Sequence, residues 1–249
     1  MNNTNKFSGL ANHYDASRPS YATELVECLF EKYQLQEHSI VADIGAGTGK
    51  FSKQLLERGC TVFCVEPNAD MRKIAEQNLQ VYKNVSIIDG SDSNTNVANI
   101  SVDFVSVAQA FHWFDADSFQ RECQRILKPD GKVILVWNMR DMKAAVNKAN
   151  YEVFQKYCPN FYGFSGGVKT EEAHILNFFQ HHVEIKKFSN PLTFTKEKFI
   201  QRCLSASYSL RPEDERYEMY LQALEQVFDD FAVDGCLTVA NDTKAYIGK

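Results

Sequence analysis

The feature that most constrains this chain is the alternation of short apolar runs with stretches of helical periodicity between residues 22 and 137. Apolar residues that recur every three or four positions predict helices, and short apolar runs bounded by turn residues predict strands. On these patterns we expect strands over 40–44, 61–65, 85–88, 102–108 and 132–137, and helices over 22–33, 48–58, 69–79 and 117–127. Repeated strand-helix units predict an α/β fold, with a doubly wound, mostly parallel sheet covered by helices on both faces.

The second half of the chain departs from this alternation. Helical patterns cover 144–157 and 170–179, and a further helical pair precedes the last apolar run. Strands over 183–188 and 237–247 could pair antiparallel at one edge, which would give a seven-stranded sheet with an edge hairpin. We predict a single domain over residues 1–249. Its core would comprise about 36–140, 180–195 and 236–249, and helical additions over about 141–180 and 196–235 would serve as a lid or as structural padding.

Composition excludes several classes of protein. Hydrophobic residues make up 44% of the 249 residues and charged residues 24%, which is ordinary for a globular chain. The net charge of −5 and the lack of a long basic run argue against nucleic acid as a partner. The polar N-terminus has no secretory signal and no apolar run is long enough for a membrane span, so we expect a cytoplasmic protein with no membrane partner. The oligomeric state has no sequence signal.

Cysteine and histidine patterns do not suggest a metal site. The seven cysteines are odd in number and form no C-x-x-C pair, which fits reduced thiols that behave as small hydrophobic residues. The six histidines have no spacing typical of metal ligands. We therefore expect no metal.

The candidate chemistry begins where the first expected strand ends, in the run Asp43-Ile-Gly-Ala-Gly-Thr-Gly49. Glycines here let the backbone turn tightly and approach a ligand closely, and the following helix offers unpaired N–H groups. Ligands of doubly wound sheets bind at the carboxyl ends of the strands. Lys50 replaces the third glycine of the dinucleotide fingerprint, and no G-K-[ST] completes a phosphate-binding loop. The run predicts a nucleotide-like ligand and weakens the case for a nicotinamide cofactor.

Acidic side chains follow the next two expected strands. Glu66, about twenty residues after Gly45 and followed by Pro67, can accept hydrogen bonds from both hydroxyls of a ribose. The alternative is an ordinary solvated glutamate at a strand end. Ser91 and Asp92 follow the third strand, where an adenine edge would lie, and Asp92 could accept a hydrogen bond from its exocyclic amine.

Three motifs resemble, in order and spacing, those of class I S-adenosylmethionine-dependent methyltransferases. They are Val41-Ala-Asp-Ile-Gly-Ala-Gly-Thr-Gly49, Val62-Phe-Cys-Val-Glu-Pro67 and Ile126-Leu-Lys-Pro-Asp-Gly-Lys132. Two further patterns resemble a small-molecule branch of this family. They are the run Gln109-Ala-Phe-His-Trp-Phe-Asp115 and the N-terminal residues Tyr14, Arg18-Pro19 and Tyr21. The resemblance covers roughly residues 14–138.

This resemblance implies S-adenosylmethionine as the cofactor, with no metal, in a Rossmann-like domain. It also implies a set of cofactor-binding residues, which follow the ligand from its methionine portion through the ribose and adenine to the methyl group. In that order they are Asp43, Gly45, Ala46, Gly47, Thr48 and Gly49, then Glu66 with Pro67, then Ser91 and Asp92, and finally Gln109 and Ala110.

Methyl transfer from a sulfonium mainly needs a nucleophile aligned behind the methyl carbon in a site that excludes water. A hydroxyl or amine acceptor must also lose a proton, and His112 is the side chain of the right type and position to take it. Alternatively, His112 packs against the adenosine or caps the following helix, while Trp113 fills the hydrophobic wall.

Five further residues are candidates for acceptor binding or for a lid. Tyr14, Arg18 and Tyr21 could close over the cofactor or bind an acidic substrate, or they could merely anchor the N-terminal segment. Asn138 and Arg140 follow the fifth strand, and Arg140 could hold a carboxylate in a bidentate contact or form a structural salt bridge.

The predicted function is transfer of a methyl group from S-adenosylmethionine to an O, N or C nucleophile of a small-molecule acceptor, with carboxylates among the candidates. One alternative is a module that binds the cofactor without catalysis. A second, weaker one is a nicotinamide-dependent oxidoreductase. The intact glycine run favours catalysis over the binding module.

Overall fold

The computed structural model describes residues 19–164 and 172–249. These residues form two compact units. The first comprises residues 19–137, 172–188 and 243–249, and the second comprises residues 138–164 and 189–242. Two of the predicted site residues, Tyr14 and Arg18, lie outside the described part of the chain.

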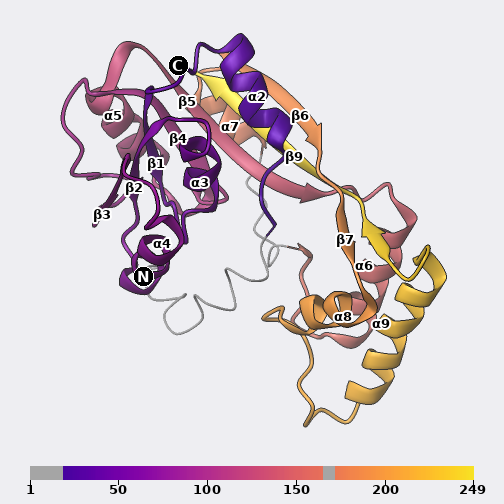
Figure 1. The fold of residues 1–249 in the computed structure, drawn as a ribbon. Coiled ribbons are helices and arrows are strands. Elements are labelled where there is room, and N and C mark those ends of the chain that lie inside the picture. The colour runs from indigo at the N-terminus through magenta and orange to yellow at the C-terminus, as the bar shows by residue number, and fades with distance from the viewer. Residues whose placement is uncertain (1–18, 165–171) are drawn as a thin grey trace. The chain divides into compact units, whose positions relative to one another are not determined.

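A seven-stranded sheet, in the order β3-β2-β1-β4-β5-β9-β6, forms the framework of the first unit (Figure 1). Its strands are β1 (Ile40–Ile44), β2 (Thr61–Val65), β3 (Val85–Ile88), β4 (Val102–Ala108), β5 (Leu127–Arg140), β6 (Val183–Ser189) and β9 (Asn241–Gly248). The first five strands pair parallel to one another. Strand β9 lies between β5 and β6 and points the opposite way from both (Figure 1). The α/β class, the seven strands and the antiparallel edge are therefore confirmed.

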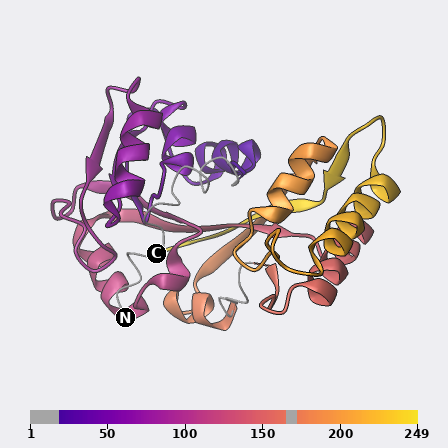
Figure 2. The ribbon, with the colours of Figure 1, turned by 90° about the horizontal axis from the view of Figure 1, so that it is seen from below.

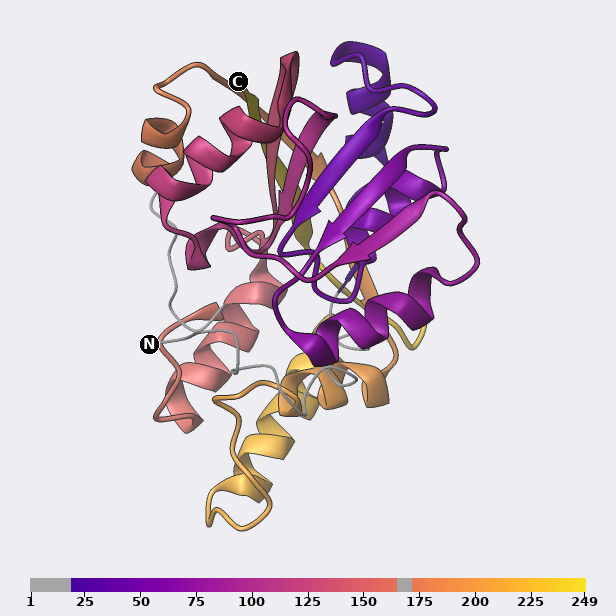
Figure 3. The same ribbon diagram turned by 90° about the vertical axis from the view of Figure 1, so that its left-hand side faces the viewer.

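Helices cover both faces of this sheet (Figure 3). Within the described residues they are α2 (Thr23–Lys32), α3 (Lys50–Leu56), α4 (Ala69–Leu79), α5 (Ala116–Ile126) and α7 (Glu172–Phe178). Alternate side chains of β1 divide the core between the two faces. Val41 packs in a cluster with residues of α2, α3 and α4, whereas Ala42 and Ile44 pack in a cluster with residues of α5 and α7.

Local sequence explains where three of these helices begin. Asn68 caps α4 by accepting a hydrogen bond from the N–H of Met71 (3.0 Å), and Asp115 caps α5 by accepting from the N–H of Ser118 (2.9 Å). Helix α3 begins only after Gly49, whose φ of 81° is left-handed, so the helix is shorter than the predicted 48–58.

Two predicted strand boundaries are wrong. Strand β5 begins at Leu127 rather than at residue 132, because residues 127–131 also belong to the strand, and a register shift between Val102 and Phe104 of β4 accommodates them. The expected strand over 237–247 is two strands, β8 (Leu237–Val239) and β9, because its first part pairs with β7 (Leu192–Phe194), which the sequence did not predict.

The second unit contains α6 (Ala145–Tyr157), α8 (Lys196–Leu204), α9 (Tyr217–Phe231) and the antiparallel pair of β7 and β8. Figure 2 shows its three helices grouped together. Their core is rich in aromatic side chains, with Phe154, Phe199, Tyr220 and Phe228 all buried. The buried Tyr220 hydroxyl shares a hydrogen bond with the Ser209 hydroxyl (2.7 Å), which satisfies both polar groups.

All seven cysteines are free thiols, and six of them are buried, where they pack as small apolar side chains. None of the helices in residues 19–164 and 172–249 combines the length and the apolar character needed to cross a membrane.

Candidate functional site

The predicted cofactor-binding residues of the first unit lie at the carboxyl ends of adjacent strands. Backbone hydrogen bonds extend the sheet just beyond these strands: the N–H of Gly45 donates to Val65 O (2.8 Å), and the N–H of Glu66 donates to Ile88 O (3.1 Å). Likewise, the N–H of Gln109 donates to the carbonyl of Val136 (2.8 Å). The sheet therefore brings the glycine turn, the acidic residue and the segment after β4 to one edge.

The glycine turn needs its glycines. Gly45, Gly47 and Gly49 have φ values of 67°, 59° and 81°, in the left-handed region that side chains disfavour. A Cβ at Gly45 would lie only 2.7 Å from the Cβ of Ala110, so the turn passes directly against the segment after β4. At Gly47, by contrast, a Cβ would meet no atom within 4 Å. The turn is therefore closely packed at its start and open in its middle.

The carboxylate of Glu66 lies against this turn. Its Oε2 accepts the N–H of Gly47 (2.9 Å) and its Oε1 accepts the N–H of Asn68 (2.9 Å), across Pro67. The residue is only 8% exposed. Burial raises the pKa of this carboxyl, while the two backbone donors and the nearby Arg72 act to lower it. A buried acidic side chain thus contacts the backbone of the glycine turn.

Asp43 is fully buried beneath the turn. Its Oδ2 accepts the hydroxyl of Ser52 (2.6 Å) and its Oδ1 accepts the hydroxyl of Ser106 (2.8 Å). Burial raises its pKa to about 6 even though both hydroxyl groups favour the charged form. Sequence reasoning did not single out these two serines. The signal that would have found Ser106 is its register, directly beside Asp43 on β4.

The adenine-side residues lie in the segment that follows β3. The N–H of Ser91 donates to the carbonyl of Asn94 (2.9 Å), which closes a turn that carries Asp92. Burial raises the pKa of Asp92, and backbone hydrogen bonds, including one from Asp115 at the start of α5, act to lower it. This segment is thus connected to helix α5.

Gln109 is followed by a short 3₁₀ helix, η2 (Phe111–Trp113). Gln109 has a φ of 60°, which is rare for a residue other than glycine. Phe111 is buried, with its ring 5.1 Å from that of Phe178. The partly buried His112 lies beside Trp113, with ring centroids 4.7 Å apart. The buried Phe111 therefore anchors the segment that carries the candidate base.

Tyr21 packs into the core of the first unit. Its ring meets that of Phe51 edge-on at 5.3 Å, and its backbone exchanges two hydrogen bonds with the amide of Gln54 (3.2 and 2.9 Å). These contacts support an anchoring role for Tyr21.

Asn138 and Arg140 belong to the second unit. The Asn138 side-chain oxygen accepts the side-chain N–H of Asn190 (3.1 Å), and the guanidinium of Arg140 lies 3.8 Å from the ring centroid of Phe164. Both residues therefore have structural contacts within their own unit.

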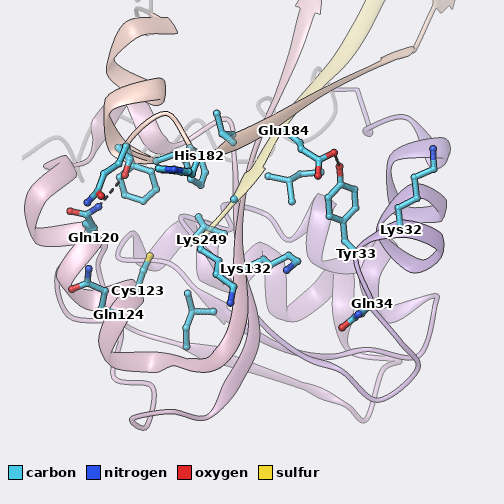
Figure 4. A pocket seen from close by; sticks show the side chains of 18 residues that line it. Lys32, Tyr33, Gln34, Gln120, Cys123, Gln124, Lys132, His182, Glu184 and Lys249 are labelled. Atoms are coloured by element: carbon cyan, nitrogen blue, oxygen red, sulfur yellow. Dashed lines mark hydrogen bonds between the residues drawn. The ribbon is translucent and has the colours of Figure 1, made fainter.

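A cavity of about 820 Å³ lies at the opposite edge of the sheet, where β5 and β6 begin and β9 ends. Figure 4 shows Tyr33 bonded to Glu184 (2.8 Å) on one side and Gln120, which donates to the carbonyl of Phe178 (3.0 Å), on the other. None of the predicted site residues lines it. Within the described ranges, no three His, Cys, Asp or Glu side chains gather as a metal site would require.

Comparisons with known proteins agree with this geometry. Residues 42–135 match the family model described as a methyltransferase domain. An uncharacterized methyltransferase-like protein of Schizosaccharomyces pombe is 34% identical over 129 residues, which are 51% of this chain and 49% of that protein. An uncharacterized methyltransferase of Mycobacterium tuberculosis is 36% identical over 135 residues, or 54% of this chain and 53% of that protein. The chain thus spans about half the length of the curated relatives it matches.

Solved structures share the fold. A protein of Anaeromyxobacter dehalogenans superposes with a TM-score of 0.65 at 19% identity, covering 93% of this chain and 97% of that one. A SAM-dependent methyltransferase of Aquifex aeolicus gives a TM-score of 0.52 at 17% identity, covering 71% and 89%. At these identities the likeness concerns the fold alone. Residues 42–135 thus match a methyltransferase domain in sequence, and the chain shares its α/β fold with these solved structures.

Proposed function

We propose that this chain transfers a methyl group from S-adenosylmethionine to a small-molecule acceptor. The observation that carries the proposal is the contact of the Glu66 carboxylate with the N–H of Gly47 (2.9 Å), because it joins an acidic side chain to the glycine turn at the carboxyl edge of the sheet. The methyltransferase domain over residues 42–135 supports the reaction type. The resemblance of residues 109–115 to a small-molecule branch supports the acceptor class.

The residues present fit an adenosyl cofactor with a methionine tail. The open space at Gly47 leaves the turn accessible to a ligand. Each oxygen of Glu66 holds one backbone N–H and has a further lone pair for a ribose hydroxyl. Asp43 would hold the turn that meets the methionine portion, and Ser91 and Asp92 would meet the adenine.

When bound, S-adenosylmethionine supplies an activated methyl group on a sulfonium. Gln109 and Ala110 would flank that group and orient it toward the acceptor. The left-handed backbone of Gln109 supports such a role, because strained residues persist where the surrounding structure and function demand them. For a hydroxyl or amine acceptor, His112 would take the proton as the new bond to carbon forms.

The acceptor-binding residues stay predictions. Arg140 carries the charge that a carboxylate acceptor would need, and its contact with Phe164 holds the guanidinium in place within the second unit. A lid role for the helices of that unit is also a prediction.

The first experiment is calorimetric titration with S-adenosylmethionine, S-adenosylhomocysteine and NAD. We expect the first two to bind and NAD not to bind. Glu66→Ala should weaken the binding of both ligands by at least about tenfold, since it removes a buried charged acceptor for the ribose hydroxyls. Glu184→Ala is the matched control, because Glu184 lies at the opposite edge of the sheet. Binding of NAD alone, or of no ligand, would overturn the proposal. Binding without turnover of any acceptor would instead favour a cofactor-binding module.

A further inference from the structure

The segment after β3, residues 89–97, is tied to helix α5 through the buried carboxylate of Glu122, which also pairs with the partly exposed Arg125. Thr95 is fully buried and donates both its N–H (2.7 Å) and its hydroxyl (2.6 Å) to Oε1 of Glu122. Arg125 donates to the same carboxylate from Nε (2.8 Å) and Nη2 (2.7 Å). Its Nη1 donates to the side-chain oxygen of Asn99 (2.6 Å), which lies just beyond the segment.

This arrangement keeps Glu122 ionised. Burial of the carboxyl raises its pKa, but the hydrogen bonds from Arg125 and Thr95 outweigh burial and lower the pKa to about 2. A buried charge is tolerated only where a counter-charge and hydrogen bonds compensate its lost hydration. Since four donors converge on this carboxylate, Thr95 has one well-defined position.

Thr95 in turn positions the residues that precede it. Gly90 packs so closely on Thr95 that a Cβ at Gly90 would lie 2.7 Å from the Thr95 carbonyl oxygen. Directly beyond Gly90 is the turn from Ser91 to Asn94, which carries Asp92. A displacement of Thr95 would therefore move the residues assigned to the adenine.

We propose that Glu122 and Arg125 are positioning residues for the adenosine end of the cofactor, and that they act through Thr95. The inference rests on the proposed function, in which Ser91 and Asp92 meet the adenine. A segment that is already ordered loses less conformational freedom when a ligand binds. The ion pair thus strengthens binding of any ligand that contains the adenosine portion.

Thr95→Val tests this role, because it removes the hydroxyl and keeps the shape of the side chain. Thr243→Val is the matched control: Thr243 is also fully buried in the first unit, and its hydroxyl accepts the N–H of Ala22 (2.9 Å). Titrations would use S-adenosylhomocysteine and 5′-methylthioadenosine, which share the adenosine portion. We expect Kd values about tenfold higher for Thr95→Val and unchanged for Thr243→Val. Thr95→Ser keeps the hydroxyl and should keep the wild-type Kd.

Hydrogen exchange gives a second readout that needs no cofactor. Amides of residues 91–97 should exchange faster in Thr95→Val than in Thr243→Val, while those of β2 remain equally protected in both. Failure of the wild type to bind S-adenosylhomocysteine would overturn the proposed function and, with it, the adenosine role. Wild-type binding with equal Kd values in the two valine variants would overturn the positioning role alone. Equal amide hydrogen exchange of residues 91–97 in the two valine variants would also overturn the positioning role.

Discussion

The two ends of the candidate cofactor site depend on buried carboxylates of opposite character. At the glycine turn, Asp43 is bonded by the neutral hydroxyls of Ser52 and Ser106, and burial raises its pKa to about 6. At residues 89–97, hydrogen bonds from Arg125 and Thr95 to Glu122 together outweigh burial and lower its pKa to about 2. Two neutral hydroxyls do not outweigh burial at Asp43, whereas a cation and two further donors outweigh it at Glu122. Mild acid should therefore protonate Asp43 at the glycine turn but should leave Glu122, beside residues 89–97, ionised.

The largest effect expected comes from the backbone of the glycine turn. Gly45→Ala would place a Cβ 2.7 Å from that of Ala110 and would force a side chain into a left-handed φ of 67°. We expect it to lower the free energy of unfolding by about 4 kcal/mol, as measured by urea denaturation. Gly235→Ala is the control, with a φ of 74° and no atom within 4 Å of its Cβ. Gly235→Ala should lower the free energy of unfolding by about 1 kcal/mol. Equal losses would mean that close packing against Ala110 does not constrain the turn.

The second prediction concerns the pH dependence that Asp43 confers. Its folded pKa of about 6 lies above the ordinary 3.8, so the folded state binds this proton more tightly than the unfolded state. The associated stability is present below pH 3.8 and is lost as the pH rises to about 6, a change of about 3 kcal/mol. Asp43→Asn removes this change.

Urea denaturation at pH 4 and pH 7 measures the pH-dependent contribution of Asp43 to the free energy of unfolding. Relative to the wild type, Asp43→Asn should gain about 2.4 kcal/mol between the two pH values, because part of the change has already occurred by pH 4. Asp130→Asn, at an aspartate whose side chain is 99% exposed, should reproduce the wild-type profile. A wild-type profile in Asp43→Asn would show that Asp43 is ionised throughout, and the contrast with Glu122 would fail.

Glu122→Gln addresses the other end of the comparison. It leaves the Arg125 guanidinium beside a neutral amide, and we expect it to lower the free energy of unfolding by about 2 kcal/mol. Because the folded pKa of Glu122 is about 2, its contribution is present above pH 4.5 and is lost only as the pH falls toward 2. The difference from the wild type should therefore be the same at pH 5 and pH 8 in urea denaturation. A difference that changes between these values would contradict permanent ionisation of Glu122.

Sequence patterns predicted the parts of this site that depend on chain order. The five parallel strands follow from local apolar runs, and the glycine turn and Glu66 follow from their places after β1 and β2. Position along the chain was sufficient there, because parallel strands bring their carboxyl ends to one edge.

The partners of the buried carboxylates could not be predicted in this way. Ser106 meets Asp43 only because β4 pairs beside β1 in one register, and Thr95 meets Glu122 only because the segment after β3 packs on α5. The same limit explains the division of the strand predicted over 237–247. Apolar residues stand at both ends of this range, but its two parts pair with different strands. Such pairings are tertiary, and a local pattern does not contain them.

The smallest expected effect concerns Arg72, which contacts Glu66 beside the glycine turn and Asp89 in the segment 89–97. Its Nη1 donates to the carbonyl of Glu66 (2.9 Å), and its Nη2 pairs with Asp89 (2.9 Å). The arginine side chain is 18% exposed and that of Asp89 is 72% exposed, so solvent screens the ion pair more than the bond to the carbonyl.

Arg72→Gln should therefore lower the free energy of unfolding by about 1 kcal/mol, and Asp89→Asn by less than about 0.5 kcal/mol. Urea denaturation at low ionic strength and in 1 M NaCl separates the two contacts, because salt screens an exposed ion pair and has little effect on a hydrogen bond to a buried carbonyl. The loss in Arg72→Gln should persist in salt, and that in Asp89→Asn should vanish. Equal, salt-sensitive losses in both variants would mean that surface charge connects the glycine turn to residues 89–97. The two ends would then share an electrostatic link that the contrast between Asp43 and Glu122 does not include.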